Sequence, residues 1–125
     1  MIDHKQLEDY ILSKPAAWLD YPFGEGVAVY KVGSKETAKM FALIKDGSSP
    51  VQISLKCAPE LAEQLREKYE SVMPGYHLNK KLWNTILVGQ LEEDYLLSLI
   101  DLSYNLVVEG LTKEEQAKLN NSTVR

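Results

Sequence analysis

Three short apolar runs, separated by brief turns, most constrain the fold of this chain. They cover residues 27–32, 39–45 and 51–56, and the turns between them leave little room for helices. Strands joined by short turns pair as an antiparallel meander, of which one face packs on a core while the other can stay open. In the third run polar residues alternate with apolar ones, so its polar side chains should point away from the core. These polar residues are Gln52, Ser54 and Lys56.

Helical patterns surround this meander. A capping box of Asp3 and Gln6 predicts a first helix, which should stop near Ser13 because the following Pro15 disfavours helical geometry at the residue before it. Pro59 suits the first position of a second helix over residues 59–69, whose apolar residues recur at helical spacing.

The C-terminal half adds two strands and two helices to the prediction. Residues 71–73 and 84–88 have strand character. A long helix, with the acidic residues 92–94 in its first turn, should run to about Glu109. A second capping box, Thr112 with Glu115, opens a short and mostly polar last helix.

The main elements follow the order α-β-β-β-α-β-β-α. We therefore predict an α+β fold of two layers, with an antiparallel sheet and helices packed mainly on one face. Residues 1–119 should form a single domain, and residues 120–125 should fray.

Composition excludes several classes of protein. The chain has 125 residues and a net charge of −4, so any anion-binding surface must be a local patch. Its single cysteine, Cys57, allows no internal disulfide, and no histidine and cysteine spacing is typical of a zinc site. No apolar run is long enough for a signal peptide or a membrane span, which predicts a cytosolic protein. We also expect no cofactor.

The most unusual stretch of the sequence is Pro74–Asn84, which gathers lysines, amides and aromatic residues. Lys80 and Lys81, with Lys56 alongside, could neutralise phosphates of a nucleic acid. Amides can bond phosphates or base edges, and aromatic rings can stack on unpaired bases. The further candidate contacts are therefore His77, Asn79, Trp83 and Asn84. On the alternative interpretation, Leu78, Leu82 and Trp83 anchor the segment to the core while the lysines are solvated.

Other functions have weaker support in the sequence. His77 could act as a general base, oriented by Glu70 if the fold brings them together, but no nucleophile motif or phosphate loop accompanies it. The consecutive acids at residues 92–94 would splay around a helix rather than converge on a metal ion. The open sheet face, carrying Gln52 and Ser54, could receive a protein partner, a second copy of the chain or a small ligand.

Four segments of the chain resemble the MmcQ/YjbR family of small bacterial proteins. They are Asp20–Gly24, Ser54–Leu61, Pro74–Thr85 and Ser103–Val107, of which Pro74–Thr85 is the most specific. One departure is Leu82, where the family commonly has a histidine.

The resemblance implies an α+β fold like that of type III secretion chaperones and frataxin, in a "double wing" arrangement associated with DNA binding. It thereby implies a non-enzymatic DNA-binding protein that uses the lysine-bearing stretch. The alternative hypothesis is a protein-interaction or small-ligand module that uses the open sheet face. The DNA-binding label rests largely on fold likeness, which is an association rather than a mechanism.

Overall fold

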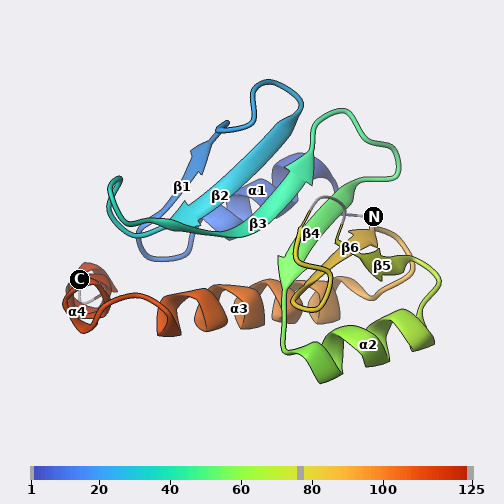
Figure 1. Cartoon of the computed structure of the whole chain (residues 1–125). Coiled ribbons are helices and arrows are strands. Elements are labelled where there is room, and N and C mark those ends of the chain that lie inside the picture. The colour runs from blue at the N-terminus through green and yellow to red at the C-terminus, as the bar shows by residue number, and fades with distance from the viewer. Residues whose placement is uncertain (1, 76–77, 124–125) are drawn as a thin grey trace.

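A six-stranded antiparallel sheet carries the fold, with its strands in the order β1-β2-β3-β4-β6-β5 (Figure 1). The computed structural model describes residues 2–75 and 78–123. The strands are β1 (Ala17–Asp20), β2 (Val27–Val32), β3 (Lys39–Lys45), β4 (Gln52–Lys56), β5 (Val72–Pro74) and β6 (Trp83–Leu87). The predicted meander is β2-β3-β4, and the two later strands extend it on the β4 side.

The helices are α1 (His4–Leu12), α2 (Pro59–Lys68), α3 (Glu93–Glu109) and α4 (Lys113–Thr123). The predicted capping box opens α1, because the Gln6 amide donates to Asp3 Oδ1 at 2.9 Å and the Asp3 amide donates to Gln6 Oε1 at 3.0 Å. Helix α4 continues to Thr123, into the segment that the sequence predicts to fray.

Strand β1 is the element that the sequence did not indicate. It pairs with β2 from Ala17 opposite Val32 to Asp20 opposite Val29, and so forms one edge of the sheet. It lies directly after Pro15 and has only four residues, which is too few to show a clear alternation. The predicted order of the main elements is otherwise confirmed, and the predicted last helix is α4.

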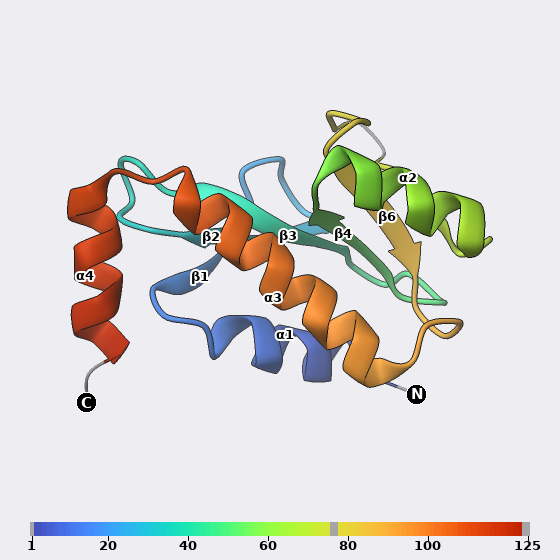
Figure 2. The ribbon, with the colours of Figure 1, turned by 90° about the horizontal axis from the view of Figure 1, so that it is seen from below.

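One face of the sheet carries the main core. Helices α1 and α3 lie side by side on this face (Figure 2), and the Tyr10 hydroxyl of α1 donates to Asp101 Oδ1 of α3 at 2.7 Å. Helix α2 packs beside β5 and β6. Fully buried side chains of helices and sheet meet here, among them Leu7, Tyr30 and Ile100. No helix among the described residues covers the opposite face.

A buried serine fixes α3 to the sheet where β3 and β4 diverge. The β3–β4 ladder ends at the pair Ala42 and Leu55, which leaves the next backbone groups without strand partners. The Ser103 hydroxyl donates to the Phe41 carbonyl at 2.6 Å and accepts from the Lys56 amide at 2.9 Å. Because Ser103 is fully buried, this bridge satisfies groups that water cannot reach.

Within the described part of the chain, no helix combines the length and apolar character that crossing a bilayer requires.

Candidate functional site

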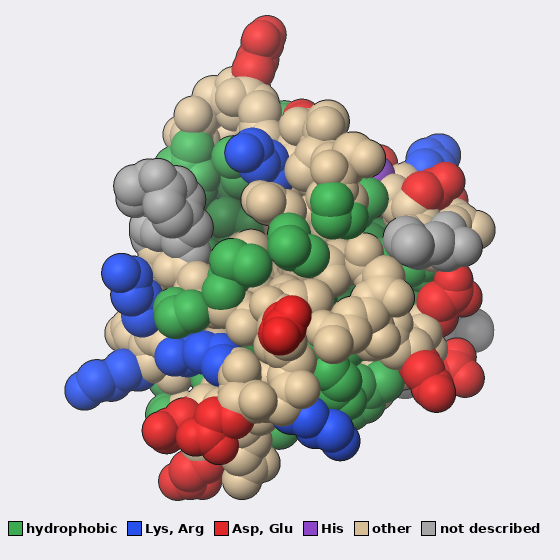
Figure 3. Space-filling view, turned by 90° about the vertical axis from the view of Figure 1, so that its right-hand side faces the viewer, with side chains coloured by type: hydrophobic (Ala, Val, Ile, Leu, Met, Phe, Trp, Pro, Cys, Tyr) green, Lys and Arg blue, Asp and Glu red, His purple; other side chains and the backbone are tan. Residues whose placement is uncertain are grey.

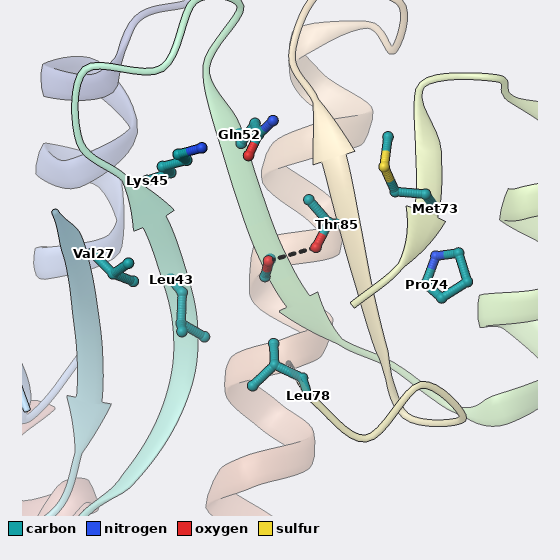
Figure 4. Close-up of a pocket in the computed structure, with 9 residues that line it drawn as sticks. Val27, Leu43, Lys45, Gln52, Met73, Pro74, Leu78 and Thr85 are labelled. Carbon is teal, nitrogen blue, oxygen red and sulfur yellow. Dashed lines mark hydrogen bonds between the residues drawn. The ribbon is translucent and has the colours of Figure 1, made fainter. Parts of the chain in front are cut away.

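The open face of the sheet is hollowed into a groove of about 510 Å³ (Figure 4). Its apolar lining comes from Val27, Leu43, Met73, Pro74 and Leu78. Its polar lining comes from Lys45, Gln52, Ser54 and Thr85. A volume of this size and a mostly apolar lining with a few polar groups are typical of small-molecule sites.

Strand pairing explains why these residues share one face. Ser54 lies opposite Leu43 on one side and opposite Thr85 on the other, so all three side chains point the same way. The Ser54 and Thr85 hydroxyls are hydrogen-bonded to each other at 2.8 Å across β4 and β6. The outward direction predicted for Gln52 and Ser54 is thereby confirmed.

One wall of the groove is the turn that follows β5. Backbone segments approach closely at its base, where the Gly75 amide donates to the Trp83 carbonyl at 2.8 Å. A Cβ atom at Gly75 would lie 2.8 Å from Trp83 Cβ, so only glycine fits this close approach. Leu78 emerges from the turn into the groove.

Trp83 anchors this wall to the open face. Its side chain is only 6% exposed and packs with Val29 and Leu43 in a second apolar cluster, separate from the main core. Leu78 and Leu82 pack against the same cluster. The interpretation of these three residues as anchors therefore fits their positions, and the buried Trp83 ring has no face free to stack on a base.

Asn84 anchors the other side of the same turn. Its side chain is 1% exposed, donates from Nδ2 to the Ala62 carbonyl at 3.2 Å, and accepts at Oδ1 from Arg66 Nε at 2.7 Å. The Arg66 guanidinium also donates from Nη2 to the Lys80 carbonyl. Helix α2, β6 and the turn are thus tied together, and Asn84 has a structural role instead of the predicted nucleic-acid contact.

Asn79 also serves the turn itself. Its Oδ1 accepts from the Lys81 amide at 3.0 Å, and its carbonyl accepts from the Trp83 amide at 2.9 Å. His77, which the sequence offers both as a candidate contact and as the candidate general base, lies outside the described residues.

The other three members of the predicted nucleic-acid set are lysines. Lys80 and Lys81 are exposed, and Lys56 lies at the end of β4 opposite Trp83. The neighbouring Cys57 amide donates to the Leu82 carbonyl at 2.8 Å, which places the end of β4 against the turn that carries Lys80 and Lys81. On the face in Figure 3, Lys and Arg side chains lie close to Asp and Glu, so that face is not an extended surface of one sign.

Two further reactive side chains, Cys57 and Tyr30, are buried. Burial raises the pKa of the Cys57 thiol, which disfavours the reactive thiolate. Burial and the Glu8 carboxylate raise the pKa of Tyr30, whose hydroxyl donates to Glu8 Oε2 at 2.6 Å. Among the described residues, no three His, Cys, Asp or Glu side chains gather into a metal-binding group.

Comparisons with known proteins agree with the fold. A model of the YjbR family matches residues 12–106. The chain is 35% identical to the uncharacterized protein YbdF of Escherichia coli over 93% of each chain. It is 42% identical to the uncharacterized protein YjbR of the same species, over 64% of this chain and 68% of that one.

Solved structures match as well. A crystal structure of a Deinococcus radiodurans protein superposes with a TM-score of 0.87 at 37% identity, covering 93% of this chain and 86% of the other. A crystal structure of a Pseudomonas syringae protein gives a TM-score of 0.71 at 31% identity, covering 85% of this chain and 99% of the other.

Proposed function

The chain belongs to the YjbR family, and on that premise we propose that it is a non-enzymatic binding protein whose ligand is a small molecule held in the groove of the open sheet face. The observation that supports this proposal is the groove itself. Its volume of about 510 Å³ lies within the range usual for ligand pockets, and polar groups are placed at a few points of an apolar lining.

The groove is also preformed. Its floor consists of paired β-strands. Its wall is held on one side by the packed Trp83 ring, and on the other by the hydrogen bonds that join Arg66 to Asn84 and Lys80. A ligand that enters a fixed site orders few protein groups on binding, so more of the contact energy appears as affinity.

Filling the groove should abolish ligand binding. In the variant Gln52→Trp, a large ring replaces a half-exposed side chain at the lining, and Gln64→Trp makes the same change on the exposed side of α2. We expect the dye anilinonaphthalene sulfonate to bind the native protein at one saturable site. Binding monitored by dye fluorescence should be lost in Gln52→Trp and kept in Gln64→Trp.

Two results would contradict the proposal: no saturable binding to the native protein, or equal binding to Gln52→Trp. Circular dichroism of both variants shows whether they are folded. If Gln52→Trp does not fold, Gln52→Tyr blocks the same position with a smaller, uncharged ring that carries a polar hydroxyl.

A second candidate function is nucleic-acid binding through the end of the sheet that carries Lys56, Lys80 and Lys81. The observation that favours it is the placement of these lysines around the contact between the end of β4 and the Lys80–Lys81 turn. No ion pair within the described residues involves any of the three ammonium groups. Phosphate contacts of this kind would give binding that depends little on sequence and strongly on salt.

Removing two of these charges tests the candidate. The double variant Lys80→Ala/Lys81→Ala should weaken binding to DNA, and the slope of log affinity against log salt should fall by about 0.9 for each phosphate that is no longer neutralised. The matched double variant Lys35→Ala/Lys113→Ala removes the same charge from exposed sites elsewhere. Titration by fluorescence anisotropy measures both. Undetectable binding at low salt, or an equal weakening in the two double variants, would rule the candidate out.

A further inference from the structure

We infer that the ligand of the groove is an amphipathic anion, with its anionic head beside Lys45 and Gln52 and its apolar body running towards Leu78. This inference rests on the proposed function, because it names the chemistry of the ligand in the same groove. It is carried by the polarity of the lining: among the described residues, the one charged side chain lies at one end, and apolar side chains flank the Ser54–Thr85 pair over the rest.

The head site lies where β3 and β4 run towards their connecting loop. Leu43 pairs with Ser54, so Lys45 and Gln52 are neighbours one step further along the two strands. Figure 4 shows both side chains at the same end of the groove. No hydrogen bond or ion pair to the Lys45 ammonium or the Gln52 side-chain amide occurs within the described residues. An ammonium and an amide N–H that are both unengaged can hold one anionic group by charge-assisted hydrogen bonds.

The charges around the groove favour an anion over a cation. Among the described residues, Lys45 is the only charged side chain that lines the groove, and no carboxylate lines it. Elsewhere on the open face, Lys31 is neutralised by Asp20 at 2.9 Å, whereas Lys56 adds positive charge at the end of β4. Asp46 follows Lys45 in sequence, but its carboxylate lies 3.9 Å from the His4 imidazole of α1. The open face is therefore locally positive in a chain of net charge −4.

The remainder of the groove suits an apolar body. Leu43 lies on the floor, Met73 on the β5 side and Leu78 at the end away from Lys45. The hydroxyls of Ser54 and Thr85 form a hydrogen bond with each other, so the polar part of the floor does not need a ligand as its hydrogen-bond partner. A flexible thioether such as that of Met73 adapts to apolar ligands of differing shape.

Three probes of equal chain length test the inference: octanoate, octanol and octylammonium, each below its aggregation concentration. Titration calorimetry with the native protein should show octanoate binding about tenfold tighter than octanol, and octylammonium weakest, because only octanoate offers an anion to Lys45. In Lys45→Gln the affinity for octanoate should fall about tenfold while that for octanol stays unchanged. Lys113→Gln, which removes an exposed charge outside the groove, should bind all three probes as the native protein does.

The results separate failure of this inference from failure of the proposed function. If octanol binds as tightly as octanoate, or Lys45→Gln and Lys113→Gln behave alike, while Gln52→Trp still abolishes binding, the groove is a ligand site but not one for anions. If none of the three probes binds the native protein at a site that Gln52→Trp blocks, the inference and the proposed function both fall.

Discussion

Replacing Trp83 with alanine is expected to lower the free energy of unfolding by about 4 kcal/mol, as truncation of a buried tryptophan does in a packed core. The Trp83 ring is 6% exposed and fills the space between Val29, Leu43 and the Leu78 side of the turn. Its removal leaves a cavity on the open face and takes away the support of the groove wall. We therefore also expect Trp83→Ala to lose binding of anilinonaphthalene sulfonate.

Urea unfolding followed by circular dichroism measures the change in free energy. The control is Trp18→Ala, the same truncation at a partly exposed position on the edge strand β1, for which we expect a decrease of about 1.5 kcal/mol. If the two truncations cost the same, Trp83 is not the anchor that its burial indicates. If Trp83→Ala still binds the dye, the groove wall does not depend on the Trp83 ring.

Replacing Asn84 with leucine is expected to cost about 3 kcal/mol of the free energy of unfolding, since it leaves a buried carbonyl and a guanidinium without their partner. Asn84 Nδ2 donates to the Ala62 carbonyl, and its Oδ1 accepts from Arg66, which also holds the Lys80 carbonyl. A leucine of similar size keeps the volume but offers neither hydrogen bond. The connection between α2 and the turn should loosen with it.

The same urea titration measures this decrease. Asn105→Leu, on the exposed side of α3, is the matched control and should change the free energy by less than about 0.5 kcal/mol. Equal stability of Asn84→Leu and the native protein would mean that the hydrogen bonds of Asn84 do not hold α2 to the turn.

The sequence predicted most of the sheet because its patterns there are local. The alternation of residues 51–56 settled which side of β4 is open, and the capping box of Asp3 settled where α1 begins. Strand β3 was also predicted, but its side chains are buried on both faces. For that reason the sequence could not show that Leu43 faces the open side.

The groove could not be predicted, because it depends on long-range strand order. Met73 and Thr85 reach it only because β6 inserts between β4 and β5, and nothing local in the sequence encodes that order. The structural roles of residues within Pro74–Asn84 could not be predicted either, because they depend on contacts with residues that are distant in the sequence. Arg66 bonds to Asn84 from 18 residues away, a contact that no local pattern in the sequence indicates.

Amide proton–nitrogen correlation spectra recorded during a titration with octanoate test most directly whether the open sheet face is the ligand site. If it is, we expect the largest shift changes at Leu43, Gln52 and Ser54, and almost none at the amides of α1 and α3. Changes confined to the helical face, or to the Lys80–Lys81 turn without the strands, would contradict it.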